Sequence, residues 1–235
     1  KFNFFTSVII GALLAMVAAA LFAAVLSKFR GDYYTFASLG FNFIVFAAML
    51  NWQSLTSGPL GIPGIPRPSL YAINFYDNLS FLILAGLFLL FTYWISNLII
   101  KSSFGRALKA IREDERTLSV FGYQTGQYKF TIFIISAGLA ALAGSLFSAY
   151  ITYIDPNTFN SNQSVFLWSV VILGGLASLR GSLLGALILV LLPEALRFVG
   201  LPDSIAAQAR DVIYGLLLIL LMMYRPQGLV GEYRL

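Results

Sequence analysis

The chain contains neither cysteine nor histidine. Without cysteine it has no disulfide framework and no thiolate metal site. Without histidine it lacks the commonest general base and the commonest transition-metal ligand, and no serine or cysteine can pair with histidine for nucleophilic catalysis. We therefore expect no catalytic residue, no metal site and no cofactor, and we expect that the chain is not an enzyme.

Charged residues are also scarce. They make up 11% of the chain, whereas hydrophobic residues make up 59%; soluble domains average about 25% charged residues. A soluble domain of 235 residues could not bury so much apolar surface, so we expect an all-α polytopic membrane protein in a lipid bilayer. The net charge of +5 does not indicate a nucleic-acid partner, because the basic residues stand mainly at the ends of apolar runs, where membrane topology explains them.

Two kinds of energy-coupling residue are missing as well. No segment reads G-x-x-x-x-G-K-[ST], so the chain does not bind ATP through a P-loop. The apolar runs also lack nearly all of the carboxylates that proton- or sodium-coupled transporters place within their spans. Energy for any transport must therefore come from elsewhere.

Four apolar runs predict the helices of a transmembrane bundle, since about 20 residues cross the hydrocarbon layer as a helix. The connection over residues 51–78 holds half of the eight prolines, which predicts turns and extended chain there rather than helix. The predicted spans are Thr6–Leu26, Tyr34–Leu50, Leu79–Ile100 and Tyr128–Ile154.

Residues 101–127 form a charge-rich block between the third and fourth spans. With Lys129 the block carries six basic residues against three acidic ones, so the positive-inside bias places it in the cytoplasm and residues 51–78 outside. Within it, Gly105–Phe121 is patterned as an amphipathic helix of about 25 Å, with Ser103 as its N-cap and Gly122 at its end. On the residues alone, this helix either rests on the membrane surface or docks on a cytoplasmic protein.

The last third of the chain contains a run too short to span. Ser164–Leu173 would measure about 15 Å as a helix, half of a bilayer. We expect it to enter the membrane partway from the outside, to turn near residues 174–180 and to return through Ser182–Leu192, a run that Pro193 stops. The bundle then contains a broken or re-entrant segment. The glycines that bracket the reversal are Gly174, Gly175, Gly181 and Gly185.

These glycines have two compatible interpretations: tight backbone packing, which we favour, and a broken helix beside a translocation path. Asn42, a polar residue within the second span, is the best candidate for a pathway residue. Small residues recur every four positions in the fourth span and predict a helix–helix contact within the subunit, with pairing to a second subunit as the alternative. They are Ser136, Ala140, Gly144 and Ser148.

The remaining connections fit the same orientation. Lys28 and Arg30 are expected inside, and residues 155–163 are expected outside. Further on, Gly200–Asp211 is expected outside, and Val212–Tyr224 is the final apolar run, followed by a tail on the cytoplasmic side.

Several motifs, in this order along the chain, resemble one family. RGDYYTFASLGFNFIV is followed by SGPLGIPGIPRP, GRALKAIREDERTLSVFGYQTGQYK, VILGGLASLRGSLLGALILVLLPEALR and YRPQGLVG. They are similar to motifs in the inner-membrane permeases of branched-chain amino acid ABC importers, the M-type subunit. Such permeases have further N-terminal helices, and this chain begins at Lys1 with its first methionine inside an apolar run. We therefore expect residues 1–235 to be a single transmembrane permease domain that lacks its N-terminal helices.

The resemblance implies that the cytoplasmic loop 101–127 holds a coupling helix that docks on an ABC ATPase subunit. It implies import of branched-chain amino acids across the prokaryotic inner membrane by alternating access. Besides the ATPases, the implied partners are a second permease subunit and a periplasmic or extracellular solute-binding protein, which the 56–68 loop could meet. The coupling motif falls on Gly105, Arg106, Ala107, Ala110, Ile111, Arg112, Glu113 and Asp114.

Alternatives stay open at this point. A permease of the same superfamily could carry urea, short amides or another amino acid. The chain could also be a secondary transporter or channel that works alone, and co-purification of an ATPase would separate these classes. An intramembrane enzyme is the weakest alternative, because the catalytic residue types are absent or lie at the edges of the spans.

Overall fold

The computed structural model describes residues 3–29, 31–70, 73–197, 215–216, 219, 223 and 228–230. The chain forms two compact units, Lys1–Phe159 and Asn160–Leu235. The described residues are mostly α-helical, and their strands are only two residues long, which confirms the all-α expectation.

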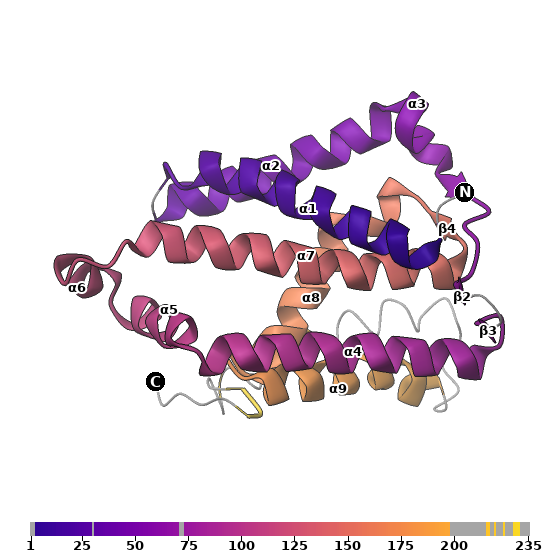
Figure 1. Ribbon diagram of the computed structural model, residues 1–235. Helices are drawn as coiled ribbons and strands as arrows, with labels where there is room; N and C mark the ends of the chain where they lie inside the picture. Colours follow the sequence, from indigo (N-terminus) through magenta and orange to yellow (C-terminus); the bar gives the residue numbers. More distant parts are fainter. Residues whose placement is uncertain are drawn as a thin grey trace. The chain divides into compact units, whose positions relative to one another are not determined.

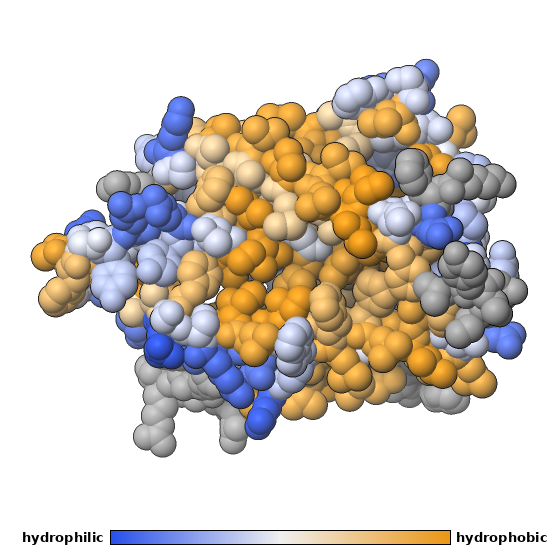
Figure 2. All heavy atoms as spheres, viewed as in Figure 1, coloured by the Kyte–Doolittle hydropathy of each residue, from blue (hydrophilic) through white to orange (hydrophobic). Residues whose placement is uncertain are grey.

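Four long helices form the first unit. They are α1 (Phe4–Leu26), α2 (Asp32–Asn51), α4 (Asn78–Lys101) and α7 (Thr125–Ile151) (Figure 1). Each is long and apolar enough to cross a membrane, which confirms the four predicted spans. Many of their large apolar side chains are exposed, as expected for surfaces that lipid covers. Figure 2 shows a broad apolar area along the middle of the helices and more hydrophilic residues toward their ends.

α1 and α7 pack against each other more extensively than any other pair in this unit. A Cβ atom on Gly138 would lie 3.0 Å from the Met16 side chain, so glycine lets the two helices approach closely. Ala149 of α7 is fully buried, whereas Ser136 and Ala140 are exposed. Gly144 and Ser148 are half-buried. The predicted stripe is therefore only partly covered within this unit, and pairing of its exposed residues with a second subunit stays a prediction.

One end of the first unit carries short strands. β1 (Ile62–Pro63) pairs antiparallel with β4 (Tyr153–Ile154), and β2 (Ser69–Leu70) pairs with β3 (Ile73–Asn74). The first pair joins the 51–78 connection to the end of α7. Both segments therefore lie at the same end of the spans, as the predicted topology requires.

Two predicted boundaries near these strands are wrong. α7 ends at Ile151 instead of Ile154, because Thr152 adopts a φ of 61° and the chain then enters β4. The 51–78 connection is not free of helix, since it begins with α3 (Gln53–Thr56) and a 3₁₀ turn, η1 (Gly58–Leu60). The prolines did not prevent this, because α3 precedes all of them and Pro59 stands in the first turn of η1, where its missing N–H is tolerated.

The opposite end of the first unit carries α5 (Ser103–Glu113) and α6 (Glu115–Val120). Both lie beyond the ends of α4 and α7, away from the strands (Figure 1). The charge-rich block therefore emerges from the spans on the side opposite to the 51–78 connection.

The second unit contains α8 (Ser161–Gly174) and α9 (Leu179–Arg197), which are joined by residues 175–178 and pack against each other. A turn in this region was predicted, and a single continuous helix is not observed. α9 passes through Pro193, so the expectation that Pro193 stops the run is wrong; one missing N–H is tolerated in an apolar helix. Predictions for Arg30, for residues 200–211, for most of residues 212–224 and for most of the tail fall outside the described residues.

Candidate functional site

The charge-rich block forms two helices and not the single helix predicted over Gly105–Phe121. The break falls at Asp114, whose backbone is extended at φ −153° and ψ 98°. Its carboxylate accepts hydrogen bonds from the Arg116 N–H at 2.9 Å and the Thr117 N–H at 3.1 Å, and from the Thr117 hydroxyl. Asp114 is therefore the N-cap of α6. The pattern Asp-x-x-Thr was visible in the sequence, but the helical periodicity that continues through it concealed the break.

The Asp114 carboxyl remains ionised at physiological pH. The hydrogen bonds from the Thr117 hydroxyl and then the Thr117 N–H hold its pKa below the ordinary value of 3.8. Because folding lowers this pKa, the ionised carboxylate stabilises the folded state fully above about pH 3.8. That stabilisation is lost only as the pH falls through the lowered pKa of the folded state. α6 is thus capped at any pH found in a cell.

The end of α4 and the start of α5 lie very close together. Ser102, and not the predicted Ser103, is the N-cap of α5: its hydroxyl oxygen accepts a hydrogen bond from the Gly105 N–H at 3.1 Å. A Cβ atom on Gly105 would lie 2.3 Å from the Ile99 carbonyl oxygen and 2.5 Å from that of Ile100. Only glycine fits there without displacing the end of α4. Gly105 therefore sets the angle between the two helices.

The predicted coupling residues divide between two faces of α5. Gly105, Ala107 and Ile111 are buried, and Ala110 is half-buried; these residues attach the helix to the rest of the unit. Arg106, Arg112 and Glu113 are exposed on the other face, and Asp114, which follows the last residue of α5, is exposed as well. Arg106 also donates a hydrogen bond to the Lys101 carbonyl at 3.1 Å, and Arg112 pairs with Glu113 at 3.2 Å.

α6 is tied to the start of α7 through Glu115. The Lys129 ammonium lies 2.5 Å from one carboxylate oxygen of Glu115, and the Thr125 hydroxyl donates to the other at 3.2 Å. Sequence analysis did not identify this link, because the partners are 10 and 14 residues apart and the intervening turn was not predictable. The block is therefore attached to α4 at one end and to α7 at the other.

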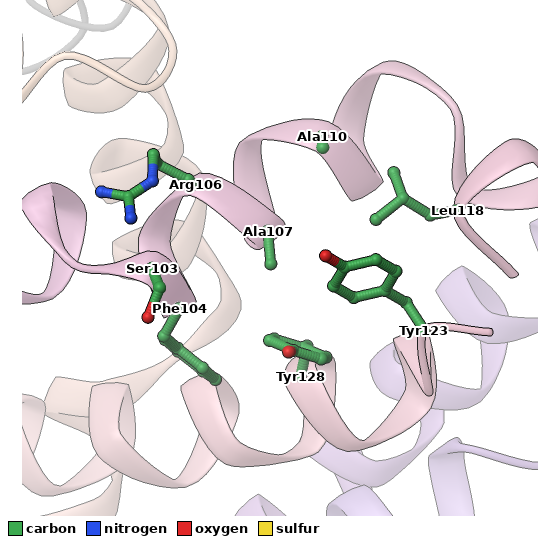
Figure 3. A pocket seen from close by; sticks show the side chains of 8 residues that line it. All are labelled: Ser103, Phe104, Arg106, Ala107, Ala110, Leu118, Tyr123 and Tyr128. Atoms are coloured by element: carbon green, nitrogen blue, oxygen red, sulfur yellow. The ribbon is translucent and has the colours of Figure 1, made fainter. Parts of the chain in front are cut away.

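An open hollow of about 470 Å³ lies between α5, α6 and the beginning of α7. The rings of Phe104 and Tyr128 stack with their centroids 5.3 Å apart, and Tyr123 lies 6.3 Å from Tyr128. Figure 3 shows Tyr123 and Tyr128 on one side of the hollow and Ala107 on the other. The stacked pair joins α5 to the beginning of α7, because Phe104 belongs to α5 and Tyr128 to α7.

Glycines allow the two helices of the second unit to touch. A Cβ atom on Gly174 would lie 2.2 Å from the Gly181 carbonyl oxygen, and one on Gly185 would lie 2.4 Å from that of Val170. Gly175 ends α8 with a φ of 112°, a conformation that other residues rarely adopt. The packing interpretation of Gly174, Gly181 and Gly185 is therefore confirmed, whereas their place beside a translocation path stays a prediction.

The sequence did not predict that residues 228–230 complete this reversal. The N–H groups of Leu229 and Val230 donate to the carbonyls of Leu173 at 3.0 Å and Gly174 at 3.1 Å. Those carbonyls end α8 and have no partner within the helix. Gly228 makes the approach possible, since a Cβ atom there would lie 2.3 Å from the Gly175 Cα.

Asn42 is half-buried on α2 in the first unit, whereas the four glycines belong to the second. Its role in a solute pathway stays a prediction.

The four spanning helices define the class: this is a multi-pass membrane protein. Residues 2–222 match the family model described as branched-chain amino acid transport system / permease component. The chain belongs to this family.

Curated relatives agree with the family model. The chain is 32% identical to the high-affinity branched-chain amino acid transport system permease protein LivM of Escherichia coli K12, over 99% of this chain and 58% of that protein. It is 25% identical to the probable branched-chain amino acid transport permease protein LivM of Methanocaldococcus jannaschii, over 96% of this chain and 68% of the relative. The permease protein LivH of Escherichia coli K12 is 31% identical over 56% of this chain and 41% of its own length.

The chain thus spans under two thirds of the length of the Escherichia coli LivM. No solved structure matches it.

Proposed function

We propose that this chain is a permease subunit of an ABC importer that moves branched-chain amino acids across the inner membrane of a prokaryote. The observation that carries the proposal is the double attachment of the α5–α6 segment. Gly105 packs the start of the segment closely against the end of α4, and Glu115 links the segment to α7 through a half-exposed ion pair with Lys129 and a hydrogen bond from Thr125. A segment held in this way moves two spans when a partner moves it.

The energy for this movement comes from a partner ATPase in our proposal. ATP binding would close two ATPase subunits, and their displacement would pass through α5 to α4 and through α6 to α7. Since α7 packs along α1, its movement would also involve α1. Repacking of discrete helices in this way is how a small shift at one site opens and closes a path elsewhere.

Two further partners belong to the proposal. The β1–β4 pair and the exposed prolines around it form the face that a periplasmic or extracellular solute-binding protein would meet, because they lie at the end opposite to α5 and α6. A second permease subunit would complete the path. Support for it comes from the similarity of this chain to both LivM and LivH of Escherichia coli K12.

Branched-chain amino acids are the proposed solutes because the relatives' names specify them. Urea, short amides and other amino acids have no comparable support.

Transport in proteoliposomes tests the proposal. The chain would be purified with the ATPase and permease subunits expressed beside it, reconstituted, and supplied with its solute-binding protein and radiolabelled leucine. We expect leucine uptake that requires ATP on the α5–α6 side and stops with a non-hydrolysable analogue. Uptake driven by a proton or sodium gradient without ATP would identify a secondary transporter instead.

A further inference from the structure

A short segment of the second unit, residues 228–230, returns to the end of α8, and we call this segment the strap. The Leu229 and Val230 N–H groups donate to the Leu173 and Gly174 carbonyls at 3.0 and 3.1 Å. Figure 1 shows the strap, in yellow, beside the junction of α8 and α9. The whole of α9 lies between the two segments in the sequence, so no local structure keeps them together.

The carbonyls that the strap covers need partners. They belong to the last turn of α8, where a helix leaves its final carbonyls unpaired. α8 is apolar, and its 14 residues measure about 21 Å, which is less than the thickness of the hydrocarbon layer. Where lipid surrounds such a helix end, an unpaired carbonyl is costly, because no water is present to donate to it. The strap therefore supplies two donors that lipid cannot.

The turn beneath the strap contains a strained residue. Ala177 adopts a φ of 64°, a left-handed conformation that is unfavourable for residues other than glycine. Within the turn, the Ser178 N–H donates to the Gly175 carbonyl at 3.3 Å, a long distance for such a bond. Strained conformations persist where the surrounding structure imposes them. The strap contributes to this, because Gly228 packs so closely that a Cβ atom there would lie 2.3 Å from the Gly175 Cα.

The strap is held through its backbone. Gly228 is buried but has no side chain, whereas the side chains of Leu229 and Val230 are 40% and 38% exposed. Two hydrogen bonds and one close glycine contact therefore oppose its release, and no buried side chain has to be withdrawn when it lifts. Contacts with so few buried apolar groups open locally without unfolding of the whole protein.

We propose that residues 228–230 open and close on the end of α8, and that the turn between α8 and α9 is fixed only while this strap is closed. When the strap lifts, the two carbonyls lose their donors and Ala177 can leave its left-handed conformation. The two helices are then free to change the angle between them. The strap thus controls the mobility of the helix break.

Crosslinking tests whether the strap lies on the turn, because the chain has no cysteine of its own. Leu176 in the turn and Leu229 in the strap are exposed, so each can be replaced by cysteine and the pair bridged by a short bifunctional maleimide in membranes. Mass spectrometry would identify the linked peptides. The matched control pairs Leu229→Cys with Val190→Cys, since Val190 is also exposed but lies about 16 Å along α9 from its start.

We expect the Leu176→Cys and Leu229→Cys pair to crosslink well above the control pair. Equal yields from the two pairs would show that the strap does not close on the turn, and would overturn the proposal.

Hydrogen exchange tests whether the strap fixes the turn. Gly228→Ala should lift the strap, because its methyl group would overlap Gly175. Gly64→Ala is the matched control: Gly64 has a φ of 78°, against 79° for Gly228, but no atom lies within 4 Å of a Cβ there. We expect Gly228→Ala to speed exchange over residues 175–178 and 229–230 about tenfold or more, as for the loss of two hydrogen bonds. Gly64→Ala should leave both stretches unchanged.

The parent protein tests whether the strap opens by itself. We expect the Leu229 and Val230 amides to exchange faster than the amides in the middle of α8. Exchange as slow as in the middle of α8 would show that the strap does not open separately, and turn exchange in Gly228→Ala equal to that in Gly64→Ala would show that it does not fix the turn. Either result overturns the proposal. Crosslinking and parental exchange also decide the question if Gly228→Ala fails to fold.

Discussion

Single glycine residues decide the geometry of the candidate site. Gly105 lies where α4 turns into α5. The Ile99 carbonyl oxygen occupies the place that a side chain on this residue would need. The sequence predicted that Gly105 belongs to the coupling segment, through the resemblance. It could not predict that the glycine serves the helix junction, because that depends on the distance between two backbones and not on any local pattern.

Replacement of Gly105 by alanine should therefore be damaging. The added methyl group would overlap the Ile99 carbonyl oxygen, and relief of that overlap would turn α5 away from α4, at a cost of about 1–3 kcal/mol. We expect Gly105→Ala to speed hydrogen exchange at the first amides of α5 and to reduce ATP-driven uptake. Gly126→Ala is the control, since no atom lies within 4 Å of a Cβ there; it should leave both measurements unchanged. Equal behaviour of the two variants would show that the junction tolerates a side chain.

At the scale of helices, hydrophobic periodicity predicted which segments are helical but not always where they end. The four spans were predictable because each is a long apolar run. The wrongly predicted helix ends lie at three residues, each for a local reason. The Asp114 carboxylate caps a new helix, Thr152 adopts a left-handed backbone conformation, and Pro193 is accommodated within α9. The hairpin of α8 and α9 was predictable because ten apolar residues before Gly174 cannot cross the hydrocarbon as an untilted helix.

Folding of the α8–α9 hairpin should depend more on the conformation of its turn than on its exposed apolar side chains. Leucine at Gly175 would be strained at a φ of 112°; strain of this kind costs about 1–3 kcal/mol. Leu187 is 57% exposed, so Leu187→Ala removes little packing. We expect Gly175→Leu to lower the yield of folded protein and ATP-driven uptake far more than Leu187→Ala, as measured by size-exclusion chromatography and by uptake. Parental folding and transport in Gly175→Leu would contradict the role given to this turn.

At the scale of the whole chain, composition predicted the class, which the four spanning helices confirm. The distribution of basic residues predicted the orientation of the spans, which stays a prediction. The pairing of α1 with α7 was not predictable, since the stripe of small residues predicted a helix contact for α7 but did not indicate which helix would be its partner. The β1–β4 pair agrees with the predicted order of the spans, because it places the 51–78 connection and the end of α7 at the same end of the unit. The proposed coupling requires in addition that α5 and α6 face the compartment where ATP is hydrolysed.

Cysteine labelling tests that requirement most directly, because the chain has no cysteine of its own. Ser54 in α3 and Ser119 in α6 are both exposed and lie at opposite ends of the first unit, so each can be replaced singly by cysteine. In intact cells, an impermeant thiol reagent should label Ser54→Cys and should label Ser119→Cys only after the inner membrane is permeabilised. Labelling of Ser119→Cys in intact cells, with Ser54→Cys protected, would place α5 and α6 outside and contradict the proposed coupling to an ATPase.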